Sequence, residues 1–260
     1  MYSLKKHLPS IAICCVASYL IPAANAVNLI TNGGFETTTN GTNKQIGTLV
    51  GSESKFTTLP GWYTTNAATA NPAFNLVFAA GAGETVGAAN RFAGLVTFYG
   101  LSNTGANTFV GVSPSGGNYV AIDGGFDVGA LNQQISGLTV GQDYTLSFSW
   151  AVAQQSGFEA PAGLTEKLVV TLGGQTIETP TISYVNHGFK GWFSQTMTFK
   201  ADSASPILSF LSVGTPTGQP PFALLDGVSL QAVPEPSSCL IGALTLSSLM
   251  LRRRRSAEVF

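Results

Sequence analysis

Histidine and cysteine, which serve often in catalytic and metal sites, are almost absent from the central part of the chain. Between Val27 and Val233 there is one histidine, His187, in the turn-like segment Asn186-His187-Gly188, and there is no cysteine. No Gly-x-Ser-x-Gly segment is present to supply the nucleophile of a triad. The lack of cysteine excludes thiolate zinc sites and cysteine nucleophiles. We therefore expect His187 to be a surface turn residue and the protein not to be an enzyme.

Carboxylates remain as possible catalytic groups, because a glycosidase needs only two of them. Four lie near glycine-rich turns: Asp123, Asp127, Glu159 and Glu166. The sequence cannot pair them in space, and an Asp followed by two glycines, as at position 123, is typical of a tight turn. A surface glycoside hydrolase is therefore the less favoured alternative.

Sugar binding needs less than catalysis, namely exposed aromatic faces with amide or carboxylate groups beside them. The ligand-binding candidates are Trp62, Gln154, Gln155, Phe158 and Trp192, which lie in or next to turn-like segments. The alternative for each aromatic residue is core packing, and we expect Trp150 to lie in the core. The favoured function is binding of glycan or exopolysaccharide, and the alternative is a structural or adhesive surface protein that binds other proteins.

Alternation of apolar and polar residues predicts that the central part is built from β-strands. The clearest case is 143–152, where Tyr144, Leu146, Phe148, Trp150 and Val152 fall on one face. Other strands are expected over 118–123, 168–172, 176–178, 193–200, 206–213 and 222–230. Residues 66–117 predict strands joined by long loops, with an Ala/Gly-rich disordered linker as the alternative. We expect one antiparallel β-sandwich domain over residues 27–232.

The charge of this central part is mildly acidic. Eleven acidic residues face six basic ones, which gives a formal charge of −5. This balance is the opposite of a nucleic-acid-binding surface, so we expect no nucleic acid partner. Because no disulfide can form there, burial of a core must stabilise the domain.

Four segments, taken together, resemble the galactose-binding-like jelly roll of carbohydrate-binding modules. They are Asn-Leu-Ile-Thr-Asn-Gly-Gly-Phe-Glu at 28–36, Pro-Gly-Trp at 60–62, Gly-Asn-Tyr-Val at 117–120 and Leu-Asp-Gly-Val-Ser-Leu at 225–230. The resemblance implies a jelly-roll sandwich. It also implies a structural Ca²⁺ held by a Glu of the first motif and the Asp of the last strand, the positions of Glu36 and Asp226.

A separate physical reason draws attention to Asp226. Strict alternation places it on the same face as Phe222, Leu224, Val228 and Leu230. A buried carboxylate needs a partner, and oxygen ligands in a cysteine-free domain suit calcium. The alternatives are that Asp226 accepts backbone N–H groups or that a β-bulge turns it outward.

The N-terminus has the organisation of a secretory signal peptide. Lys5 and Lys6 precede an apolar stretch over 8–21, and Ala24-Asn25-Ala26 supplies the small-x-small pattern that signal peptidase recognises. We expect residues 1–26 to be removed, with cleavage after Ala26. The alternative is an uncleaved membrane helix.

The C-terminus, residues 233–260, combines three features in a fixed order. These are the motif Pro234, Glu235 and Pro236, an apolar run over 239–251, and the cluster Arg252, Arg253, Arg254 and Arg255. As a helix the run reaches only about 20 Å, against roughly 30 Å of bilayer hydrocarbon. This order resembles the PEP-CTERM sorting signal of Gram-negative bacteria. It implies recognition by exosortase, a short and transient inner-membrane helix, and delivery to the cell surface or an extracellular matrix, with a permanent tail anchor as the alternative.

Overall fold

The computed structural model describes residues 27–48, 53–65, 72–92, 94–100 and 111–234. The predicted signal-peptidase site at Ala24 and Ala26 lies outside these residues, as do Glu235, Pro236 and the arginine cluster. Within the described residues, no helix has the length and apolar character needed to cross a membrane.

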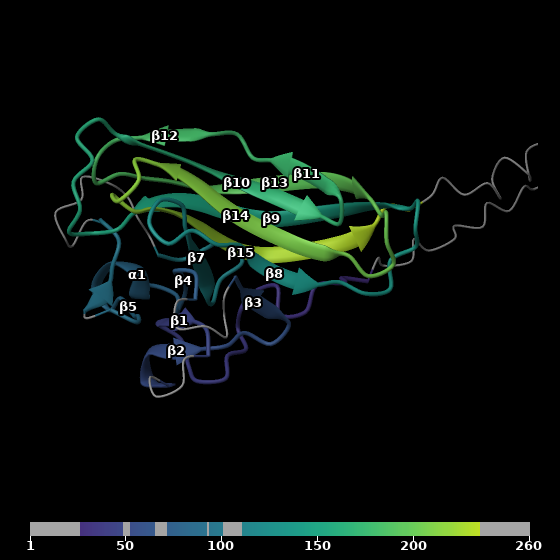
Figure 1. Ribbon diagram of the computed structural model, residues 1–260, viewed down its shortest axis with the longest axis horizontal. Helices are drawn as coiled ribbons and strands as arrows, with labels where there is room; N and C mark the ends of the chain where they lie inside the picture. The colour runs from purple at the N-terminus through teal and green to yellow at the C-terminus, as the bar shows by residue number, and fades with distance from the viewer. Residues whose placement is uncertain (1–26, 49–52, 66–71, 93, 101–110, 235–260) are drawn as a thin grey trace, which may run out of the picture.

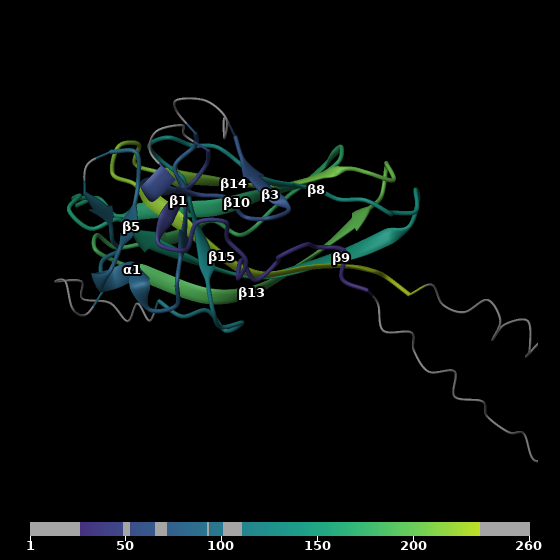
Figure 2. The same cartoon turned by 90° about the horizontal axis from the view of Figure 1, so that it is seen from below.

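Two β-sheets pack face to face in a sandwich (Figures 1 and 2). In the described residues the first sheet has nine strands, in the order β13-β9-β15-β7-β4-β1-β5-β6, with β2 beside β1. They are β1 (Lys44–Ile46), β2 (Phe56–Thr57), β4 (Asn75–Phe78), β5 (Ala88–Ala89), β6 (Leu95–Val96), β7 (Tyr119–Asp123), β9 (Asp143–Gln154), β13 (Phe189–Lys200) and β15 (Pro221–Ala232).

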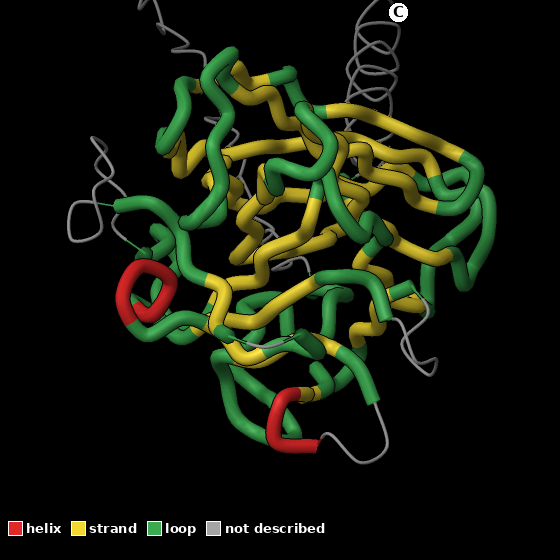
Figure 3. Tube along the Cα trace, turned by 60° about the vertical axis from the view of Figure 1, so that its left-hand side comes forward, coloured by secondary structure: helices red, strands yellow, loops and turns green. Residues whose placement is uncertain are grey.

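The second sheet has six strands over the same described part, in the order β11-β10-β14-β8-β3, with β12 beside β10. They are β3 (Trp62–Thr64), β8 (Leu131–Gln134), β10 (Leu164–Leu172), β11 (Gln175–Glu178), β12 (Ile182–Tyr184) and β14 (Ile207–Thr215). Strand pairing is antiparallel except where β1 meets β2 and β5. Among the residues that the structure describes, helix is limited to α1 (Ala82–Thr85) and the 3-10 turn η1 (Glu53–Lys55) (Figure 3, red). The all-β expectation is therefore confirmed.

The main core lies between the two sheets and follows the predicted alternation. The five apolar residues of β9 on one face are all buried there: Tyr144, Leu146, Phe148, Trp150 and Val152. They meet Leu168, Val170 and Leu172 of β10 from the opposite sheet. Each such side chain contributes about 1.5–3 kcal/mol by leaving water, so this interface is the main stabilising element of the domain.

A second apolar cluster covers the outer face of the first sheet. Phe78, Phe98 and Tyr119 pack there with ring centroids 5.2 and 5.4 Å from Phe78. The cover is the segment that carries α1, β5 and β6. The described part of the 66–117 region is therefore packed structure, as expected, and is not a solvated linker.

The last strand contains a β-bulge at Asp226, which was one of the alternatives that the sequence left open. Pairing between β15 and β9 shifts register between Asp226 and Ser229, and Gly227 adopts a left-handed φ of 62° that suits glycine. An extra residue in one strand reverses the alternation of side chains beyond it.

The prediction that Asp226 shares one face with Phe222, Leu224, Val228 and Leu230 is therefore wrong. Phe222 and Leu224, before the bulge, belong to the outer cluster, whereas Val228 and Leu230, after it, belong to the main core. Asp226 is fully buried rather than turned outward.

Antiparallel order brings several loops together at one end of the sandwich. Asp123 at the end of β7 pairs with Phe222 near the start of β15, and Pro221 pairs with Gln154 at the end of β9. The described chain begins and ends at the opposite end, where Val233 N donates to Asp143 O over 2.9 Å.

Candidate functional site

A pocket of about 390 Å³ opens among these loops. Its walls include four phenylalanines and two amide side chains: Phe74, Phe92, Phe126, Phe158, Asn90 and Gln155. The remaining lining residues are apolar residues of β6, Gly218 and Pro220, so no described lining residue carries a charge.

Three of the phenyl rings form one cluster that makes an aromatic wall. The centroids of Phe92 and Phe126 lie 5.7 Å apart, and each lies about 6 Å from Phe74, at 5.8 and 6.0 Å. Phe74 is buried, whereas the other two rings are 45% and 54% exposed. Exposed phenyl faces held by a buried third ring form a rigid apolar surface for a ligand.

Phe158 and Gln155 contribute a further part of the lining, from the loop after β9. Phe158 makes no ring contact with another described residue, and the side-chain amide of Gln155 bonds to none of them. Both of these predicted residues therefore lie at the pocket. The amide of Gln155 offers one donor pair and one acceptor beside aromatic carbon.

Gln154, by contrast, is fully buried and its side chain bonds to other residues of the protein. Its Nε2 donates to Phe158 O over 2.8 Å and to Asn186 Oδ1 over 3.1 Å, and its Oε1 accepts from His187 N. The prediction that Gln154 contacts a ligand is wrong, because the strand continues to this residue and turns its side chain inward. Its role is to hold the loop that carries Phe158.

Asp123 organises the turn that carries Phe126, as its sequence context predicted. Its carboxylate accepts hydrogen bonds from the amides of Gly125, Phe126 and Asp127 over 2.8–3.0 Å. Burial raises the pKa of Asp123 to about 6, while two of these amides and the charge of Arg91 act in the opposite direction.

Trp62 is a core residue, which corrects its proposed role in binding. It is 4% exposed, its indole N–H donates to Asn32 O over 3.0 Å, and its ring packs 5.4 Å from Phe35. Trp192 is half-buried against the outer cluster, 5.8 Å from Tyr119, and does not line the pocket. The three aromatic candidates therefore do not form one patch.

The remaining titratable residues are engaged elsewhere. His187 lies in a turn with a positive φ of 56°, stacks on Tyr99 at 3.8 Å and bonds Glu159 over 2.9 Å. Asp123 and Glu166 are both fully buried, so neither reaches a ligand in the pocket.

Glu36 and Asp226 are brought to the same place, next to Gly34. Glu36 is exposed and accepts from Asn118 N over 2.8 Å, and Asp226 accepts from the Ser113 hydroxyl and from Gly227 N. Burial, and in smaller part the charge of Glu36, raise the pKa of Asp226 to about 6. Among the described residues no three His, Cys, Asp or Glu side chains form a metal-binding group.

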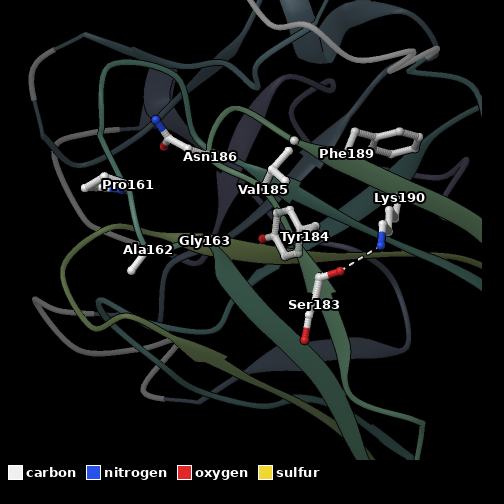
Figure 4. Close-up of a pocket in the computed structure, with 10 residues that line it drawn as sticks. Pro161, Ala162, Gly163, Ser183, Tyr184, Val185, Asn186, Phe189 and Lys190 are labelled. Atoms are coloured by element: carbon white, nitrogen blue, oxygen red, sulfur yellow. Dashed lines mark hydrogen bonds between the residues drawn. The ribbon is translucent and has the colours of Figure 1, made fainter.

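A larger depression, of about 600 Å³, lies between β12 and the start of β13 (Figure 4). Three of its four polar side chains, those of Tyr184, Asn186 and Lys190, are already engaged. Lys190 Nζ donates to Ser183 O over 2.8 Å, Asn186 bonds Gln154 and Ala160, and Tyr184 is buried. The aromatic pocket offers a better site, because it has exposed rings and an uncommitted amide.

Phe92 and Phe126 were missed by the sequence interpretation. A signal was available for Phe126, since it follows Gly124-Gly125 directly, the same aromatic-in-turn context that singled out Phe158. Phe92 stands in a segment whose course cannot be read from alternation.

The geometry thus defines an all-β sandwich domain with an aromatic pocket on its loops. The chain belongs to the DUF642 family, described as a protein of unknown function, whose sequence pattern matches residues 78–231. No curated protein matches the chain.

Carbohydrate-binding modules are among the solved structures that resemble it. The TmCBM61 module in complex with β-1,4-galactotriose is 13% identical, with 80% of this chain and 100% of that chain covered and a TM-score of 0.38. The CBM22-1 xylan-binding domain from Paenibacillus barcinonensis Xyn10C is 15% identical, with 62% of this chain and 94% of that chain covered and a TM-score of 0.32. The K3 adhesin domain of Lys-gingipain from Porphyromonas gingivalis is 12% identical, with 66% of this chain and 91% of that chain covered and a TM-score of 0.35.

Proposed function

We propose that the protein is a non-catalytic glycan-binding domain of the galactose-binding-like jelly-roll type, and that the pocket formed by Phe74, Phe92, Phe126, Phe158 and Gln155 is its binding site. The observation that carries the proposal is the pair of exposed phenyl rings beside an amide that no described residue engages. Phenyl faces accept the C–H face of a pyranose ring, and the amide supplies hydrogen bonds to its hydroxyls.

The size and charge of the pocket support the same proposal. Small-ligand sites typically enclose about 300–1,000 Å³, and this pocket lies within that range. Without a charged lining residue in the described part, the site suits an uncharged sugar better than a uronate or a sulfated sugar.

Titration calorimetry of the purified protein against a panel of neutral and acidic polysaccharides tests the proposal. Phe126→Ala and Phe92→Ala should abolish the binding heat or reduce affinity strongly. Tyr63→Ala is the matched control, because Tyr63 is an aromatic residue with 42% exposure on β3, outside the pocket. Binding heats that are unchanged in both pocket variants would sink the proposal.

The proposed location follows from the sequence ends. Signal peptidase and exosortase would process the chain, and the domain would act at the surface or in the extracellular polysaccharide of a Gram-negative bacterium. Fractionation of native cells tests this location: the processed protein should be recovered outside the cytoplasm.

A structural Ca²⁺ at Glu36 and Asp226 is a further proposal, and the residues present fit it. Two carboxylates and the Ser113 hydroxyl converge from the first motif, the last strand and the segment before β7. A cation there would relieve the repulsion between the carboxylates, and carbonyl oxygens would complete its usual six to eight ligands.

A further inference from the structure

Arg91 is the one described cation that lies over the rings of the aromatic wall, and it joins two segments that lie far apart in the sequence to its own loop. One end of its guanidinium donates to Pro72 O, in the segment that leads into β4, and the other end pairs with the carboxylate of Asp127, in the loop after β7. The Arg91 side chain is only 10% exposed in this arrangement. One planar group therefore fixes three chain segments relative to each other.

The same guanidinium lies against the rings of the pocket. Its central carbon is 4.7 Å from the centroid of Phe92 and 5.9 Å from that of Phe74. A cation over a phenyl face is attracted by the ring quadrupole, so Arg91 holds these rings as well as the backbone.

The backbone of Arg91 is itself anchored from β1. Gln45 is fully buried, and its Oε1 accepts from Arg91 N over 2.9 Å. Its Nε2 lies 3.3 Å from the carbonyls of Pro72 and Ala73, the segment that Arg91 also binds. The position of the guanidinium is therefore set from two sides.

Asp127 extends the connection to the third ring. Its backbone carbonyl accepts from Phe74 N over 3.0 Å, and its own amide donates to Asp123 Oδ2 over 2.9 Å. Phe126 precedes it, so the ion pair with Arg91 fixes the loop at the position next to the more exposed ring.

From these contacts we infer that Arg91 is the positioning residue of the pocket: it does not line the pocket, and it holds Phe74, Phe92 and Phe126 in the arrangement that a sugar would stack on. The inference rests on the proposed function for its consequence in binding, and on the geometry alone for its consequence in the loops. A lysine could keep the charge, but it could not bridge two acceptors while lying flat on a ring.

The test uses Arg91→Met and Arg91→Lys, with two readouts. The first is the dissociation constant for the neutral polysaccharide that the wild-type protein binds. The second is hydrogen exchange of the Phe74 and Asp127 amides, compared with an amide of β9 in the main core. We expect at least about tenfold weaker binding in both variants and faster exchange at Phe74 and Asp127, with unchanged exchange in β9.

Two further variants keep the test decisive. Lys167→Met removes a comparable ion pair, with Glu178 on β11, and should change neither readout. Asp127→Asn keeps the shape of the partner and removes its charge, so it should shift both readouts in the same direction by a smaller factor even if Arg91→Met does not fold.

The inference is overturned if Arg91→Met binds within about twofold of wild type, or if Arg91→Lys restores wild-type values. If the wild-type protein binds no glycan, the proposed function fails and exchange alone decides: unchanged exchange at Phe74 and Asp127 overturns the positioning role, and faster exchange there supports it.

Discussion

Glu166 and Asp123 approach each other from opposite sheets, near the edge where the pocket loops begin. Glu166 is fully buried on β10, and its Oε2 lies so close to Gly124 that a Cβ there would be 2.3 Å away. Burial, with a smaller contribution from the charge of Asp123, raises the pKa of Glu166 to about 8. The protonated carboxyl is therefore the form that suits this site at neutral pH.

This pKa makes the stability of the domain depend on pH. The folded state binds the Glu166 proton more tightly than the unfolded state, so its contribution is complete below about pH 4.5 and is lost as pH rises to about 8. The loss is on the order of 5 kcal/mol. Glu166→Gln should remove the part of this slope between pH 6 and 8, measured by urea denaturation. A variant with the wild-type slope would contradict the assignment.

Replacing Phe126 should affect binding more than stability. The ring is 54% exposed, so its removal creates no core cavity, but the aromatic wall loses its outermost face. We expect Phe126→Ala to bind neutral glycan about tenfold or more weakly, with a melting temperature within a few degrees of wild type. Calorimetric titration and thermal melting of the same sample provide the measurement. A large fall in melting temperature with intact binding would contradict the prediction.

Replacing Trp62 should produce the reverse pattern. Its indole is buried between Phe35 and Phe210 in the main core. We expect Trp62→Ala to lower the free energy of unfolding by about 3–5 kcal/mol, while affinity per folded molecule is retained. Denaturant titration gives the first quantity, and a specific loss of affinity without destabilisation would show that Trp62 does reach a ligand.

Replacing Gln154 should loosen the loop that carries Phe158. Gln154→Leu fills similar volume but removes the hydrogen bonds of the Gln154 amide to the Phe158 carbonyl and the His187 amide. A cost of about 1–3 kcal/mol follows for the loss of these buried hydrogen bonds, with faster hydrogen exchange across 157–160. If the variant exchanges these amides at the wild-type rate, Asn186 and Tyr99 hold the loop without help from Gln154.

Chelation tests the calcium proposal. If Glu36 and Asp226 hold Ca²⁺, excess chelator should lower the melting temperature by removing ligand linkage, and Glu36→Gln should abolish that effect. Equal melting temperatures with and without chelator would contradict the metal site. Burial without a cation would then favour the protonated form of Asp226.

The sequence predicted those parts of the fold in which alternation is unbroken. β9 was recognised because its inward residues are all large and apolar, and the hairpin of β10 and β11 because two glycines mark its turn. The β15 bulge was only one of the alternatives for Asp226, because one inserted residue leaves no pattern of its own. Of the predicted binding residues, only Gln155 and Phe158 line the pocket, since exposure of an aromatic residue is set by what packs over it.

The pocket and the last described residues lie at opposite ends of the sandwich. Val233 lies beside Asp143 at the start of β9, whereas Gln155, just past its other end, lines the pocket. Twelve extended residues place these points roughly 40 Å apart. Any tether that continues from Val233 would therefore leave from the side remote from the phenylalanines, so a molecule held there would present the proposed binding pocket outward, without obstruction by its own support.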